Sequence, residues 1–183
     1  MADGPVLDAL NAARRMLADC YWWRRIADAD SPWDQATALA HIHFDGLPPA
    51  DPGPNHSLAQ MTALRPFAIM WTDITGGLRI RNATAGYTCN VPSGRIIAQI
   101  ELPVPTAIAS DPTAVADDIS RKIGLILRTG DSDQPGLFEL AGRSGYLPLT
   151  EVELFGYART DAKAAEDLGD IVFAELQISW GLE

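Results

Sequence analysis

Glutamates at alternate positions of three predicted strands are the residues whose type and spacing could carry chemistry. They are Glu101, then Glu151 with Glu153, and finally Glu175. Side chains two residues apart on a strand point to the same face, so the polar faces of these strands could crowd several carboxylates together. Paired carboxylates on neighbouring strands could act as acid and base in glycoside hydrolysis or hold a divalent cation. The other interpretations are a solvated sheet face, or an acidic surface that faces a DNA channel or a partner ring.

Three further groups of residues are weaker candidates. His41 and His43 would point the same way in an extended chain, but a third metal ligand at a defined spacing is missing. Residues 142–145, Gly-Arg-Ser-Gly, lack the leading strand and the lysine of a phosphate-binding loop, so we interpret them as a turn. Cys20 falls on a predicted helix face, where a small core residue is expected rather than a nucleophile. We therefore predict no catalytic residue, no bound metal, no cofactor and no enzymatic activity.

The charge of the chain limits its partners. Its 183 residues include 24 acidic and 14 basic side chains, which gives a formal net charge of −10. Affinity for a nucleic-acid backbone comes from Lys and Arg that neutralise phosphates, so this chain is not expected to grip DNA. The same charge suits a surface past which DNA slides without sticking.

Composition predicts a globular protein made in the cytoplasm and not bound to a membrane. Hydrophobic residues make up 47% of the chain and charged residues 21%, as in ordinary folded domains. The start of the chain lacks the basic region of an export signal, and no apolar run reaches the roughly 18 residues of a membrane span. Cys20 and Cys89 are far apart and in no metal-like spacing, so we expect two reduced thiols.

Four strands are predicted from alternation and bounding turn residues. The central one covers residues 94–105, with an apolar face and a mainly polar face. Its apolar face holds Ile96, Ala98, Ile100 and Leu102. Residues 147–159 and 171–180 repeat this design, and residues 65–73 form a mainly apolar, buried strand. Residues 78–81 and 87–91 are predicted to form a hairpin that projects from the sheet.

Helices are predicted before and after the central strand. Residues 5–27 carry apolar side chains at helical spacing, and Ser31 with Pro32 predicts the start of a second short helix that ends near residues 44–46. The clearest helix begins after Asp111 and stops at Gly130, with one stripe of Val115, Ile119, Ile123 and Ile126. Trp22 and Trp23 are adjacent and point in different directions. One of them packs under the following loop or contacts another subunit.

The predicted fold class is α+β. We expect a two-layer sandwich, in which a four-stranded, mostly antiparallel sheet with a projecting hairpin packs against one main helix and the N-terminal helices. Residues 1–46 are predicted to form a helical arm, the proline-rich residues 47–60 a linker, and residues 61–183 the sandwich domain.

The order of these elements resembles the tail-terminator, or tail-completion, proteins of long-tailed phages and gene-transfer particles. The resemblance spans nearly the full chain and depends on element order rather than on an active site. It is carried by the N-terminal helix, Ala38-Leu39-Ala40-His41-Ile42-His43-Phe44 running into Leu47-Pro48-Pro49, Arg65-Pro66-Phe67-Ala68-Ile69-Met70-Trp71, the strand at 94–105, the helix at 111–128, residues 145–157, and Ile178-Ser179-Trp180-Gly181.

The resemblance implies a structural protein of the virion. Such proteins form a homo-oligomeric ring, commonly of six subunits, at the head-proximal end of the tail. The ring stops polymerisation of the tail tube protein, docks to the head connector or stopper protein, and leaves a channel through which DNA passes without specific binding. Like charge would keep this channel non-adhesive, so Glu101, Glu151, Glu153 and Glu175 are candidates for a surface that faces the lumen or a partner.

The ring interface has three candidate regions in the sequence. These are Trp22 or Trp23, the hairpin at residues 78–91, and the extended segment at residues 47–55. Two alternatives to the ring remain: another neck or tail adaptor that binds one partner, and a carboxylate-based hydrolase.

Overall fold

Strand β4 (Asn90–Pro103) is the central strand of the sheet, as its alternation predicts. The computed structural model describes residues 5–44, 65–72, 79–82, 90–127, 134, 136–137, 140, 149–160 and 170–180. In this part of the chain, five strands follow one another in the order β1-β2-β4-β6-β5. The other four are β1 (Ile42–Phe44), β2 (Phe67–Thr72), β5 (Leu149–Arg159) and β6 (Ile171–Trp180).

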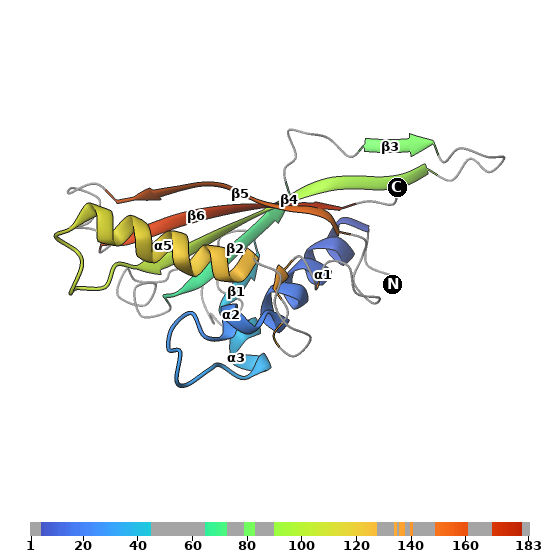
Figure 1. Ribbon diagram of the computed structural model, residues 1–183. Helices are drawn as coiled ribbons and strands as arrows, with labels where there is room; N and C mark the ends of the chain where they lie inside the picture. Colours follow the sequence, from blue (N-terminus) through green and yellow to red (C-terminus); the bar gives the residue numbers. More distant parts are fainter. Residues whose placement is uncertain are drawn as a thin grey trace, which may run out of the picture.

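The sheet is mostly antiparallel and carries the predicted projecting hairpin. Strand β2 is antiparallel to β4, β4 to β6 and β6 to β5, whereas β1 runs parallel to β2. Strand β3 (Arg79–Asn82) pairs with residues 90–93 at the start of β4. This ribbon extends beyond the helices, which lie together on one side of the sheet (Figure 1). The α+β class, the helical layer and the hairpin are thus confirmed.

The sheet has one strand more on its main path than predicted. The second short helix was expected to reach residues 44–46, but helix α3 (Gln35–Ala40) ends earlier, and β1 follows at once. The backbone N–H of Ala68 donates to the carbonyl of His41 at 2.8 Å, and Ile42 and Phe44 then pair with β2. Such a short segment becomes a strand because a partner strand lies beside it, which the local sequence does not encode.

The N-terminal helical segment is broken where one helix was predicted. Helix α1 (Pro5–Asp19) and helix α2 (Tyr21–Arg24) are separated by Cys20, whose backbone is extended with φ −64° and ψ 120°. The cap of α3 also differs from the prediction, which assigned Ser31. Asp34 is the cap, and its side chain accepts a hydrogen bond from the N–H of Thr37 at 2.7 Å.

Helix α5 (Pro112–Leu127) forms as predicted. The backbone N–H groups of Thr113 and Ala114 donate to Oδ1 of Asp111 at 2.9 and 3.2 Å, so the aspartate satisfies donors that the first turn leaves open. The predicted stripe of Val115, Ile119, Ile123 and Ile126 is buried. Because these residues recur every three or four positions, one side of the helix covers the sheet.

One hydrophobic core joins the helices to the inner face of the sheet. Strand β4 contributes its predicted apolar face, and β6 contributes alternate residues from Val172 to Trp180. Residues of α1 and α2 lie in the same core, so the predicted helical arm packs directly on the sheet. The predicted linker at residues 47–60 lies outside the described residues.

Arg159 ties the ends of β5 and β6 to the loop before α5. Its Nε donates to Oδ1 of Asp170 at 2.9 Å, and its Nη2 donates to Oδ2 of Asp170 and to the carbonyl of Ala109, both at 2.6 Å. The hydrogen bond from Arg159 lowers the pKa of Asp170 below its ordinary value. The bidentate pair holds the guanidinium of Arg159 in place, and its bond to Ala109 links the loop before α5 to the sheet.

The buried stripe of α5 predicts a large effect of truncation at Ile123. Ile123→Ala should lower the free energy of unfolding by about 2–5 kcal/mol, because it removes a fully buried side chain from the core. Urea unfolding would measure this loss. Gly124→Ala is the matched control, since the added methyl group meets nothing within 4 Å and should stabilise the helix by up to about 1 kcal/mol.

The ion pair between Arg159 and Asp170 predicts a pH-dependent contribution to stability. A carboxyl group whose pKa is lowered on folding stabilises the protein above its unfolded pKa, and this stabilisation is lost as pH falls through the folded value. Asp170→Asn should therefore unfold in less urea than wild type at pH 7, with a difference that shrinks below the ordinary pKa of 3.8. Asp117→Asn, at an exposed position of α5, controls for the loss of one charge. A pH-independent difference would contradict the assignment.

Candidate functional site

The predicted acidic positions lie on the face of the sheet opposite the helices. In the register, Gln99 is opposite Glu175, and Glu153 is opposite Gln177. Glu151 is opposite Ser179, one row further along. The alternation of the strands therefore brings these positions to one face, as expected from the sequence.

Glu101 does not belong to an exposed acidic surface, which corrects the prediction for this residue. Its side chain is 9% exposed, and Nε of Arg65, itself 3% exposed, donates to its Oε2 at 3.2 Å. Burial raises the pKa of Glu101, and the hydrogen bond and charge of Arg65 oppose part of that rise. The ion pair neutralises this end of the face, so the acid and its base form a structural contact instead of adding to a surface potential.

The remaining acidic positions are spread over two strands. Glu153 is exposed on β5, and Glu175 is half-buried on β6, whereas the side chain of Glu151 lies outside the described part of the structure. A carboxylate pair for hydrolysis or for a divalent cation thus loses Glu101 as a free partner. Among the described residues, no group of three or more His, Cys, Asp or Glu is placed to hold a metal ion.

The outer face of the sheet is also more apolar than the alternation of the strands predicts. Phe67 and Ile97 on this face are 2% and 7% exposed, and Ile69, Trp71 and Phe173 are half-buried. The signal was present in β2, where apolar residues occupy both parities of the strand. In β2 the apolar side chains of both faces are buried or half-buried, as expected for a strand with apolar residues on both sides.

The two adjacent tryptophans both lie in α2, after the helix break, and their side chains have different surroundings. Trp23 is fully buried, its Nε1–H donates to the carbonyl of Ala38 at 3.3 Å, and its ring meets Trp33 edge to face. Trp23 is therefore a core residue, and its prediction as an interface residue is wrong. Trp22 is half-buried and packs edge-on against Tyr21 at a centroid distance of 5.1 Å.

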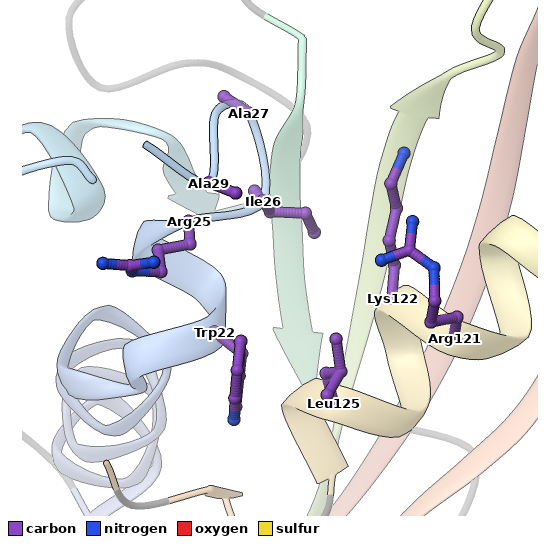
Figure 2. Close-up of a pocket in the computed structure, with 8 residues that line it drawn as sticks. All are labelled: Trp22, Arg25, Ile26, Ala27, Ala29, Arg121, Lys122 and Leu125. Carbon is purple, nitrogen blue, oxygen red and sulfur yellow. The ribbon is translucent and has the colours of Figure 1, made fainter. Parts of the chain in front are cut away.

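Trp22 lines a cleft between α2, the loop that follows it, and α5 (Figure 2). The cleft has a volume of about 220 Å³. Its walls are formed by Trp22, Arg25, Ile26, Ala27, Ala29, Arg121, Lys122 and Leu125. The sequence alone does not reveal this cleft, because its two walls are about a hundred residues apart in the chain.

The side chains of the cleft divide into an apolar floor and a basic wall. Trp22 and Leu125 face each other across it, while Arg121 and Lys122 extend along the cleft from α5 (Figure 2). Arg25 is turned away from α5, and its guanidinium lies over the ring of Tyr21 at 4.7 Å. Such a surface suits a ligand that is apolar and acidic at once.

The two histidines have structural contacts. Nδ1 of His41 lies 2.8 Å from the carbonyl oxygen of Pro66, and its ring stacks on Trp33 at 4.1 Å. His43 is 1% exposed in β1, where its ring lies against Phe67 at 5.8 Å.

Cys20 is a core residue, as predicted. It is buried, and burial raises the pKa of its thiol. Its Sγ lies 3.8 Å from the carbonyl oxygen of Ile126, to which it donates, so the break between α1 and α2 rests on the end of α5. A thiol of this kind is a poor nucleophile because the thiolate is disfavoured.

Comparison with known proteins leaves the family of this chain a prediction. No protein-family model matches the sequence, and no curated protein matches it significantly. In the described ranges, none of the helices has both the length and the hydrophobicity needed to span a membrane.

The buried pair of Arg65 and Glu101 predicts strong coupling between the two side chains. Glu101→Gln alone should cost about 3–5 kcal/mol of unfolding free energy, because it leaves the buried guanidinium without its carboxylate. Arg65→Met combined with Glu101→Gln should cost less than the sum of the single changes by about 0.5–3 kcal/mol. Denaturant unfolding of the four proteins of this cycle gives the coupling energy, and simple additivity would show that the two groups do not act as a pair.

Proposed function

We propose that this chain is the subunit of a ring at the head-proximal end of a phage-type tail. In this role the ring ends polymerisation of the tail tube, joins the tail to the head connector or stopper protein, and leaves a channel for DNA. The protein would then be part of the virion neck, assembled in the host cytoplasm. The order of elements in the sequence resembles that of the tail-terminator family. The ribbon formed by β3 and the start of β4 gives the proposal physical support.

The observation that carries the proposal is the ribbon formed by β3 and the start of β4. Residues 90–93 of β4 pair with β3, whereas residues 94–103 pair with β6 in the body of the sheet. The ribbon reaches away from the helical layer (Figure 1). An isolated two-stranded ribbon is at best marginally stable in water, so packing against a surface on another molecule would stabilise it.

A projecting ribbon suits assembly from head to tail. Each copy would place its ribbon on a different patch of the next copy, and such contacts close into a ring when the rotation between copies is correct. Strand edges and ribbons are common means of such contact, because backbone hydrogen bonds supply affinity. A contact with the next copy would also explain why the chain carries a ribbon that does not pack on its own core.

Charge supports a channel for DNA. The chain has a net charge of −10, and Glu151, Glu153 and Glu175 remain candidates for the lumen or partner surface after Glu101 is removed from the set. An acidic lining would not bind phosphates, so DNA could pass without specific contacts.

Removal of the ribbon tests the proposal. Arg79 and Ser93 are Cα partners, so a two-residue Gly-Gly turn can replace residues 80–92. Wild type should form closed rings with an open centre, seen as a large native mass and in negative-stain images at two concentrations and two salt levels. The shortened variant should fold with an unchanged helical circular dichroism signal and remain monomeric.

The two outcomes that would count against the proposal are distinct. A shortened variant that still closes into rings would reject the ribbon as the interface. A wild-type chain that stays monomeric in all conditions, also alongside tail tubes, would reject the ring and favour an adaptor that binds a single partner.

A further inference from the structure

The cleft between α2 and α5 is a basic, apolar surface on an acidic protein. Its volume of about 220 Å³ is below the roughly 300–1,000 Å³ typical of cofactor sites, so it suits one or two side chains. Its floor is Trp22, Ile26 and Leu125, which offers a tryptophan and two aliphatic side chains to an apolar anchor. Aromatic pockets of this kind are enriched at the centres of protein interfaces.

The carboxylate of Asp118 holds the two side chains of the basic wall in place. Asp118 accepts a bond from Nη2 of Arg121 at 2.6 Å and from Nζ of Lys122 at 2.7 Å. Partial burial works to raise the pKa of Asp118, but the hydrogen bonds from Lys122 and Arg121 outweigh it and lower the pKa. Two cations against one carboxylate leave a positive excess, and the side chain of Arg121 is 64% exposed and keeps further donors for an acidic ligand.

The complementary group lies at the start of α1. Leu7 is an exposed large hydrophobic residue with 41% of its surface accessible, and the next residue, Asp8, is an exposed acid in the first turn of the helix. An apolar side chain beside a carboxylate is the arrangement that the cleft would select. The exposed aspartates of the cleft loop, Asp28 and Asp30, weaken the local field but are not among the lining residues.

We infer that the cleft receives Leu7 and Asp8 of a second copy of this chain. Leu7 would enter between Trp22 and Leu125, and the carboxylate of Asp8 would meet Arg121 and Lys122. The contact cannot form within one copy. Helix α1 holds Leu7 about 18 Å from Asp19, and α2 with the cleft follows only after Asp19. The start of α1 on one copy would meet the cleft of the next copy. A contact between two different patches is head-to-tail, so this inference rests on the proposed ring and names a second part of its interface.

Charge reversal at both sides tests the contact. Leu7→Ala and Lys122→Glu should each weaken self-association roughly tenfold, as measured by sedimentation velocity over a range of concentrations. Asp8→Lys should weaken it as well. The double variant Asp8→Lys with Lys122→Glu should regain association, and so should an equimolar mixture of the two single variants, because each mixed contact then pairs opposite charges.

Two matched controls separate this contact from a general effect of charge. Arg15→Glu changes the net charge as Lys122→Glu does, on the exposed side of α1. Asp117→Lys changes it as Asp8→Lys does, at an exposed position of α5 outside the cleft. Both controls should associate like wild type. Thermal unfolding checks that each variant is folded, and Leu7→Ala alters an exposed residue, so it keeps the test valid if Lys122→Glu is unstable.

Each remaining outcome overturns a defined statement. Rings of wild-type strength in Leu7→Ala and Lys122→Glu would overturn this inference and leave the ring in place. Loss of association in Lys122→Glu alone, without an effect of Leu7→Ala or Asp8→Lys, would mean that a different acidic segment occupies the cleft. The absence of any association in wild type, also alongside tail tubes, would overturn both the contact and the proposed ring.

Discussion

The structure depends on burying one face of strand β4. Alternate side chains from Ile96 to Leu102 point into the core, and β6 continues the same apolar surface beside them. An exposed face of this kind would cost roughly 25 cal/mol for each Å² left in water, so helices must cover it. Helix α5 does so with its single stripe, and α1 and α2 cover the rest. The other elements are placed by this requirement: β2 and β6 flank β4, and the ribbon continues where the core ends.

The break at Cys20 connects the core to the cleft. Trp22 and Trp23 are about 100° apart around the axis of α2, and the extended backbone at Cys20 changes the direction of this short helix relative to α1. Trp23 then enters the core and bonds to Ala38, and Trp22 turns toward α5. The same short helix therefore contributes Trp23 to the core and Trp22 to one wall of the cleft.

The net charge of this protein does not describe how its charged side chains are distributed. The net charge is −10, yet one of the four predicted acids is paired with Arg65 in the interior, and a basic wall stands on α5. Buried pairs contribute little net stability because desolvation offsets their attraction, but breaking one leaves an uncompensated charge. Uneven charge on one surface favours one orientation of a binding partner over others.

The sequence by itself determined the α+β class, the central strand, the capped helix α5 and the projecting hairpin, because periodicity and caps are local properties. It placed the acidic positions of the strands on one face for the same reason. Only the tertiary structure decided that residues 42–44 form a strand, since these three residues pair only because β2 lies beside them. Tertiary packing also decided that Glu101 is buried with Arg65, that Trp23 rather than Trp22 enters the core, and that Trp22 meets Leu125. These outcomes depend on contacts between segments distant in the chain, and a local sequence pattern does not specify which distant segment will pack against it.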